Sequence, residues 1–170
     1  MNALTAIRAI KTMAMDLLFP IACAGCGTEG AYLCAPCSTT LSRRAPACFV
    51  CKKFVPASPK GAPAGRTCRS CRKKCSVYAS FSPFSYQDQA IRALVRQLKY
   101  HRTRDIASLF AELISQELAF YGVSLPDDVL IVPIPLYPGR ERVRGFNQAG
   151  LIAEHCAERL RIKCRSDILK

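Results

Sequence analysis

The chain has 170 residues, half of them hydrophobic, and its 25 basic and 12 acidic residues give a formal charge of +13. This length suits one ordinary domain plus a small one, and the hydrophobic content excludes wholesale disorder. The charge favours anionic partners: nucleic acid, phosphorylated small molecules or acidic membrane surface. No apolar run reaches the roughly 20 residues that span a bilayer. We therefore expect a cytoplasmic protein without a transmembrane segment.

The first segment, residues 1–19, predicts a short amphipathic helix that ends before Pro20. Its apolar side chains recur every three or four residues, at Leu4, Ile7, Ile10 and Leu17. We expect this helix to pack on the neighbouring module, and a membrane-surface helix is the alternative. Asp16 interrupts the apolar stretch that a signal peptide would need.

Residues 20–75 contain four Cys-x-x-Cys pairs. The pairs are Cys23/Cys26, Cys34/Cys37, Cys48/Cys51 and Cys68/Cys71. Two thiolates at this spacing can reach one ion from a tight turn, and two such pairs complete a tetrahedral site. A segment so poor in aliphatic side chains does not stabilise itself by burial alone. These features predict a double zinc ribbon with two structural Zn²⁺ ions, which would lower the net charge to about +9.

Consecutive pairing of the cysteines is the simplest arrangement, although interleaved pairing stays open. Disulfides, an iron–sulfur cluster and redox dithiols are the alternatives to zinc. The remaining cysteines, Cys75, Cys156 and Cys164, are expected to be ordinary thiols. Basic residues gather around the second ribbon, at Lys52, Lys53, Lys60, Arg66, Arg69, Arg72, Lys73 and Lys74.

Residues 76–170 change in character and predict the order helix, helix, strand, loop, helix. The expected elements are an extended stretch or strand pair at 77–86, helices around 90–98 and 105–120, a buried parallel strand at 129–132, a loop at 133–145 and a helix at 147–161. This order is typical of the start of an α/β domain.

The loop after the predicted strand is a candidate anion site. Arg140, Arg142 and Arg144 precede a helix that opens near Asn147, where backbone amides and the helix dipole favour an anion. A solvated charged face is the alternative, because Glu141 stands between the arginines.

Several stretches resemble the bacterial competence protein F (ComF) family. The matching stretches are residues 17–26, 33–37, 46–51, 94–100 and 132–149, of which GFNQ at 145–148 is the most specific. The resemblance implies an N-terminal double zinc ribbon followed by a type I phosphoribosyltransferase-like α/β domain. It further implies that residues 133–138 receive pyrophosphate and that Lys99, Arg140, Arg142 and Arg144 lie near the phosphates of phosphoribosyl pyrophosphate.

The chain departs from this family pattern at its C-terminal end. Family members continue into a strand that ends in Asp-Asp and a Thr-Thr-Gly loop, which bind the ribose phosphate and the Mg²⁺-linked substrate. The only Asp-Asp here, Asp127-Asp128, precedes a strand. We therefore expect an incomplete, C-terminally truncated phosphoribosyltransferase-like domain without turnover, or a partner chain that supplies the missing half.

Two functions follow as expectations. The first is a ComF-family phosphoribosyltransferase-like protein linked to DNA uptake or nucleotide metabolism, and whether it is an enzyme stays open. The alternative is a zinc-ribbon accessory module that binds single-stranded DNA. A purely structural ribbon with a basic surface is the simpler reading of the charge.

Overall fold

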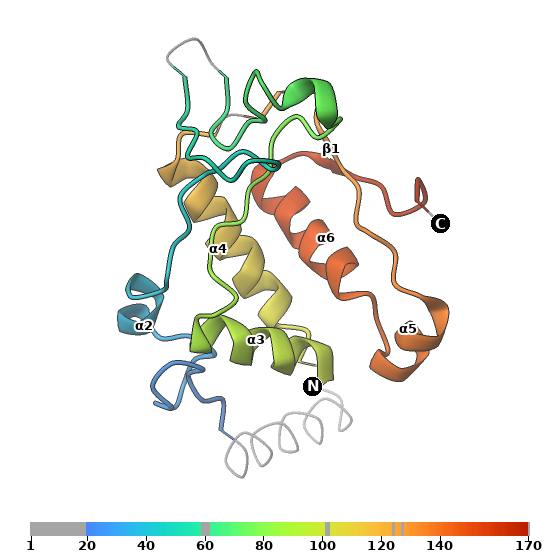
Figure 1. The fold of residues 1–170 in the computed structure, drawn as a ribbon. Helices are drawn as coiled ribbons and strands as arrows, with labels where there is room; N and C mark the ends of the chain where they lie inside the picture. The colour runs from blue at the N-terminus through green and yellow to red at the C-terminus, as the bar shows by residue number, and fades with distance from the viewer. Residues whose placement is uncertain (1–19, 59–61, 101–102, 124, 127, 170) are drawn as a thin grey trace.

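The structure is a computed structural model that describes residues 20–58, 62–100, 103–123, 125–126 and 128–169; the helix predicted within residues 1–19 lies outside these ranges. Its elements in chain order are α2 (Ala35–Thr39), the 3-10 helix η1 (Arg72–Lys74), α3 (Gln89–Tyr100), α4 (Ile106–Phe120), β1 (Leu130–Ile131), α5 (Pro138–Arg144), α6 (Gln148–Leu160) and β2 (Lys163–Cys164). The three long helices and β1 lie where the sequence predicts them (Figure 1).

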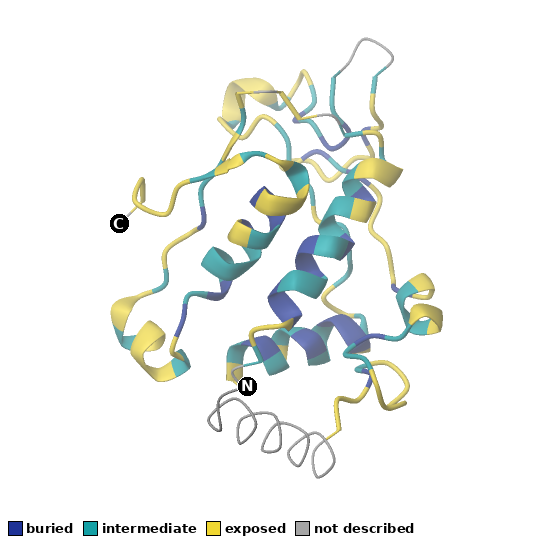
Figure 2. Cartoon of the chain, turned by 180° about the vertical axis from the view of Figure 1, so that it is seen from behind, coloured by how far each residue is buried: buried dark blue, intermediate teal, exposed yellow. Residues whose placement is uncertain are grey.

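The hydrophobic core lies between α3, α4 and the first cysteine segment. Leu94 of α3 and Ile106 of α4 are fully buried, and Leu33 and Leu41 from the cysteine segment belong to the same cluster. Figure 2 shows buried residues on both α3 and α4. The core therefore joins residues on both sides of the domain boundary expected at residue 75.

The α/β character rests on one parallel strand pair. β1 pairs with β2 in the register Leu130↔Lys163 and Ile131↔Cys164, and α6 lies between them in the chain. This β-α-β order is the unit from which parallel sheets are built. β2 was not predicted, because two residues carry too little periodicity to indicate a strand.

The expected loop at 133–145 contains a helix. α5 begins with Pro138 in its first turn, where the fixed φ of proline suits a helix start. It ends at Gly145, whose φ of 83° is left-handed. In the stretch 77–86, the described residues form isolated antiparallel bridges, Arg66↔Ala79 and Arg43↔Phe84, and so take the extended form and not the strand pair.

The chain between the two cysteine segments is anchored to α4. Arg43 donates through Nε to Oε1 of Glu117 at 2.7 Å, and its guanidinium also lies over the ring of Phe120. The Glu117 side chain is buried, and its Oε2 atom has no partner among the described residues. Since a buried carboxylate is costly unless it is paired, this contact fixes the linker on the helix.

The two cysteine segments lie at opposite ends of the molecule. Figure 1 shows the first beside α3 and the second beyond the C-terminal end of α4. At that end, Tyr121 contacts Phe81 with ring centroids 5.9 Å apart. Across the described ranges, no helix is long and apolar enough to cross a membrane.

Candidate metal centres and basic surface

The first Cys-x-x-Cys pair forms a tight knuckle. The Cys23 carbonyl accepts from the N–H of Gly27 at 2.8 Å, and the N–H of Cys23 donates to the Thr28 carbonyl at 2.9 Å. Gly27 has a φ of 78°, which glycine adopts without steric cost. Gly25 is required for another reason, because a Cβ there would lie 2.8 Å from Sγ of Cys37.

The third pair repeats this hairpin. The Cys48 carbonyl accepts from the N–H of Lys52 at 3.0 Å, and the Cys48 N–H donates to the Lys53 carbonyl at 2.9 Å. Antiparallel bridges Ala22↔Glu29 and Ala47↔Phe54 close the two hairpins at matching positions. Lys52 occupies the place of Gly27 and has a left-handed φ of 59°.

Each knuckle meets a second pair from further along the chain. Cys34 immediately precedes α2 and Cys37 lies within it. Cys68 and Cys71 both precede η1. The sulfur atoms gather in two groups, each with all Sγ atoms within 4.8 Å of one another: Cys23, Cys26, Cys34 and Cys37, and separately Cys48, Cys51, Cys68 and Cys71. The consecutive grouping expected from the sequence is therefore the one that the structure has.

The spacing of the sulfur atoms fits a single ion at the centre of each group. A tetrahedral zinc with Zn–S bonds of about 2.3 Å separates its sulfurs by about 3.8 Å. The Sγ atoms lie 3.5 Å apart for Cys23–Cys34, 3.6 Å for Cys26–Cys34 and 3.8 Å for Cys51–Cys68. All eight cysteines are free, and these separations are well beyond the S–S bond of about 2.05 Å. Each group could hold a metal ion.

Hydrogen bonds from backbone N–H groups lower the pKa of one thiol in each group. The N–H of Cys34, at 3.3 Å from the sulfur, is the main cause that lowers the pKa of Cys23 to about 6. Backbone N–H groups of Cys51 and Cys68 likewise lower the pKa of Cys48 to about 6. The sulfurs of neighbouring cysteines raise the pKa of Cys37 and of Cys71 to about 12. Four thiols this close ionise together only beside a cation, so metal binding must release protons.

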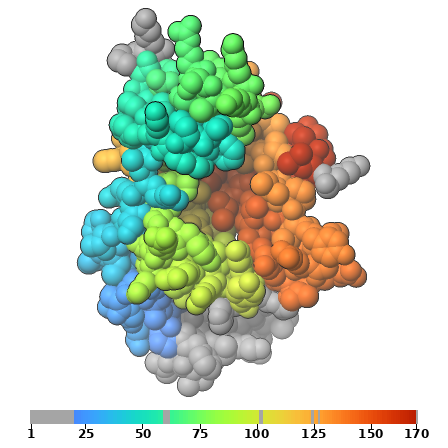
Figure 3. Space-filling view, in the orientation of Figure 1, coloured from blue at the N-terminus to red at the C-terminus, as the bar shows by residue number. Residues whose placement is uncertain are grey.

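The second cysteine segment carries an uninterrupted positive charge. Residues 30–87 contain no acidic residue and ten basic ones. The basic residues are Arg43, Arg44, Lys52, Lys53, Lys60, Arg66, Arg69, Arg72, Lys73 and Lys74. Figure 3 shows the second cysteine segment as a lobe at one end of the molecule. Even if a four-thiolate zinc site there contributes two negative charges, the excess stays positive.

Exposed aromatic rings lie among these cations. Phe54 is 62% exposed, Tyr78 56% and Phe49 46%. Lys52 Nζ lies 4.9 Å from the centroid of Phe49, and the Arg72 guanidinium lies 5.5 Å from that of Tyr78. The lysines and arginines could be predicted from the sequence but the rings could not, because ring exposure depends on the tertiary fold.

The residues predicted to bind phosphate are only partly brought together. Lys99 lines a 390 Å³ pocket between α3, α4, α6 and residues 134–136. Arg144 lies near it, over the ring of Tyr100 at 5.6 Å. Arg140 and Arg142 are exposed on α5. Arg104, which was not predicted, joins this region by donating to the Gly145 carbonyl at 3.2 Å.

The GFNQ stretch has a structural role at each position. Gly145 ends α5, and Phe146 is buried in the core. Asn147 caps α6 by accepting from the N–H of Ala149 at 3.0 Å, and it donates to the Ile134 carbonyl at 3.2 Å. Gln148 is buried and accepts from Arg144 at 3.0 Å. The stretch therefore fixes α5, α6 and the preceding loop relative to one another.

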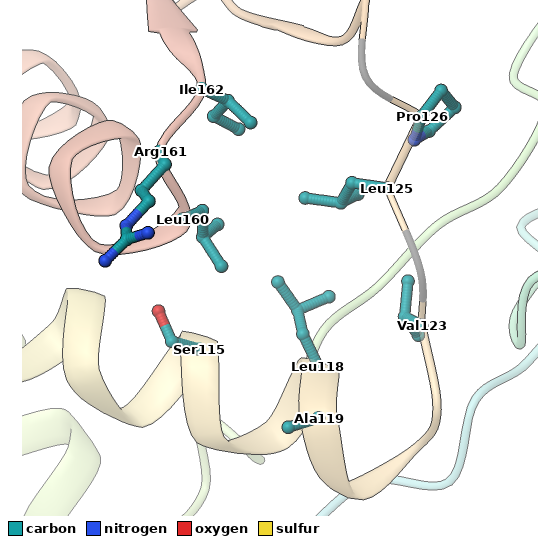
Figure 4. A pocket seen from close by; sticks show the side chains of 9 residues that line it. All are labelled: Ser115, Leu118, Ala119, Val123, Leu125, Pro126, Leu160, Arg161 and Ile162. Atoms are coloured by element: carbon teal, nitrogen blue, oxygen red, sulfur yellow. The ribbon is translucent and has the colours of Figure 1, made fainter.

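A 470 Å³ pocket lies between the C-terminal ends of α4 and α6. Figure 4 shows Leu118, Leu125 and Leu160 pointing toward its centre and Arg161 pointing away. The hydroxyl of Ser115 donates to the Ala111 carbonyl at 2.7 Å. The described lining includes no carboxylate, histidine or cysteine, so this pocket presents neither an acid–base pair nor a metal ligand.

The described residues form two tetracysteine groups that could each hold a metal ion, and a β-α-β unit follows them in the chain. No protein-family model and no solved structure matches it. Curated relatives do match, and each is named DNA utilization protein YhgH. The chain is 32% identical to the one from Salmonella typhimurium over 129 residues, and 29% identical to the one from Escherichia coli K12 over 126 residues. The alignments cover 74% and 72% of this chain but only 53% and 52% of the relatives, so the chain spans about half their length.

Proposed function

We propose that this chain is a ComF-type protein in which two Zn²⁺ ions hold the cysteine groups and the second ribbon binds single-stranded nucleic acid. The observation that carries the proposal is the set of exposed rings next to cations, in a segment without acidic residues. The names of the relatives, which refer to DNA utilization, support it.

The chemistry of single-strand binding matches this surface. Proteins that bind single strands without sequence preference combine cations along the backbone with aromatic rings on which bases stack. Phe54 and Tyr78 offer ring faces, while Arg72 beside Tyr78 supplies a cation close to the same base. Phe54 pairs with Ala47 in the hairpin of Cys48, and the Tyr78 carbonyl accepts from the N–H of Thr67 at 2.7 Å, next to Cys68. A metal ion in the second cysteine group would therefore hold both rings in place.

The test uses the zinc-loaded full chain and a fluorescein-labelled 15-nucleotide oligothymidylate. Phe54→Ala and Tyr78→Ala should each weaken binding about 5- to 150-fold, since one stacked base is worth about 1–3 kcal/mol. Tyr137→Ala is the matched control, because Tyr137 is 74% exposed but lies at α5. Absence of binding at low salt would overturn the proposal, as would equal losses in all three variants.

Phosphoribosyl pyrophosphate binding is the second candidate function. The β-α-β unit and the placement of Lys99 and Arg144 around one region favour it. In this proposal phosphoribosyl pyrophosphate binds together with Mg²⁺. Labelled phosphoribosyl pyrophosphate should be retained by the protein in equilibrium dialysis with Mg²⁺, and an absence of retention would contradict this candidate.

A further inference from the structure

A polar cleft lies between the linker that joins the two cysteine segments and residues 80–85. Its volume is 630 Å³, the largest among the cavities described above. The lining that matters for its chemistry is Arg44, Phe49, Lys52, Ser80, Ser82 and Ser85. The walls are fixed by backbone hydrogen bonds, from Arg44 N–H to the Pro83 carbonyl at 2.8 Å and from Ser85 N–H to the Ser42 carbonyl at 2.9 Å.

Two cations border this cleft in different ways. Lys52 Nζ donates to the Phe49 carbonyl at 2.7 Å, which holds the ammonium group at the cleft. Arg44 is exposed and forms no ion pair with any described residue. Arg43, by contrast, is bound to Glu117. Arg44 is therefore the guanidinium that is free to bind an anion.

Hydroxyl groups complete the donor set. In the described part of the chain, the hydroxyls of Ser80 and Ser82 form no hydrogen bond to a protein group. The Ser85 oxygen accepts from the N–H of Gln87 at 3.2 Å, which leaves its own proton to donate. A guanidinium, an ammonium and several hydroxyls around one cleft are donors for phosphate oxygens. The described lining contains no carboxylate, and nearby Glu117 is paired with Arg43.

We infer that this cleft binds a backbone phosphodiester of the single strand, with the adjoining base stacked on Phe49. The inference rests on the proposed function and adds a defined phosphate position to it. Phe49 is 46% exposed and carries Lys52 over its ring, so phosphate and base contacts lie side by side. A 5′-terminal phosphate offers the same chemistry, and the experiment separates the two sources.

The experiment compares Arg44→Gln, the double variant Ser80→Ala/Ser82→Ala and the control Arg96→Gln, which removes an exposed charge on α3. Each zinc-loaded full chain is titrated with oligothymidylate that ends in a 5′-hydroxyl or a 5′-phosphate, over a range of salt. Arg44→Gln should weaken binding of both oligonucleotides about three- to tenfold and reduce the log–log salt slope by about 0.7, the value for one single-strand phosphate. The double serine variant should weaken binding without changing the slope, and Arg96→Gln should do neither.

The outcomes separate this inference from the proposed function. If the wild type binds and all three variants match it, the phosphate site is wrong and the proposed function stands. Losses confined to the 5′-phosphorylated oligonucleotide would overturn the phosphodiester assignment in favour of a chain end. If the wild type binds neither oligonucleotide, both proposals fail in their stated form. The protein is then titrated with inorganic phosphate, and changes in the NMR signals of the Ser80 and Ser82 backbone amides show whether the cleft binds an anion. Thermal unfolding of each variant checks that the substitutions leave the fold intact.

Discussion

The residues that follow the first and third cysteine pairs occupy equivalent positions in two similar hairpins but differ in side chain. Gly27 and Lys52 both close a knuckle with a left-handed φ, at 78° and 59°. A left-handed conformation costs a residue with a Cβ about 1–2 kcal/mol, which glycine avoids. Lys52 adopts this less favourable conformation, and its ammonium group lies over the ring of Phe49.

We predict that Lys52→Gly separates stability from binding. Relief of the left-handed strain offsets the roughly 0.5–1 kcal/mol of entropy that glycine costs and the loss of an exposed cation–π contact worth about 0.5–1 kcal/mol. The free energy of unfolding of the zinc form should therefore stay the same within about 1 kcal/mol, while affinity for the oligothymidylate falls. Urea unfolding and fluorescence anisotropy measure the two quantities.

Lys53→Gly is the matched variant for stability, because Lys53 has no positive φ and gains no strain relief. It should lose about 0.5–1 kcal/mol. A larger loss for Lys52→Gly than for Lys53→Gly would contradict the argument from strain.

At the scale of the elements, α3 depends on a carboxylate from outside the helix. Asp88 accepts from the N–H groups of Ala90 at 3.0 Å and Ile91 at 3.2 Å, as an N-cap does. Its other oxygen accepts from the N–H of Ser42 at 2.8 Å, in the linker between the cysteine segments. One side chain therefore ties the start of α3 to that linker.

This arrangement predicts a pH dependence. Burial by itself would raise the pKa of Asp88, but the N–H groups of Ser42, Ile91 and Ala90 outweigh it and lower that pKa. Because the folded pKa is lowered, the stabilisation is present above the unfolded pKa of about 3.9 and is lost as the pH falls through the folded pKa. The difference in unfolding free energy between wild type and Asp88→Asn should therefore shrink below about pH 4.

The measurement is urea unfolding of both proteins between about pH 3 and pH 7. Metal content is measured at each pH, and the two proteins are compared only where both keep their metal, because loss of the first ion would also loosen α3. A difference that is constant over this range would show that the charge on Asp88 does not contribute.

At the scale of the whole molecule, the two cysteine groups contribute unequally to the hydrophobic core. Cys23 and Leu33 of the first segment belong to the core that includes α3 and α4. The second segment is held at the far end of α4 by its two flanks, through the contact of Arg43 with Glu117 and that of Phe81 with Tyr121. Removal of metal should therefore affect the two ends differently.

We predict that Cys26→Ser/Cys34→Ser loosens α3 and that Cys48→Ser/Cys68→Ser affects mainly the second ribbon. Zinc content should fall from two ions to one in each double variant. The helical signal in far-ultraviolet circular dichroism and amide exchange in α3 should change more for the first variant, and chelation of the wild type should reproduce both effects. Equal protection of α3 amides in the two variants would contradict this assignment.

The candidate site divides into a part that could be predicted from the sequence and a part that could not. The four Cys-x-x-Cys knuckles follow from local spacing, because two residues between thiols fit one knuckle. Which knuckles share a site stayed open in the sequence, and the structure groups them consecutively. The rings of Phe54 and Tyr78 and the cleft at Ser80 and Ser82 depend on how the linker pairs with residues 80–85. Such contacts join distant residues, and a local pattern does not report them.

The sequence by itself determined the four cysteine pairs and the approximate positions of the three long helices, because spacing and amphipathic periodicity are local properties. The tertiary structure decided that residues 138–144 are a helix and that β2 pairs with β1. It also decided that Arg144 contacts Gln148 and Tyr100. Each of these depends on contacts between parts of the chain whose proximity only the folded backbone establishes.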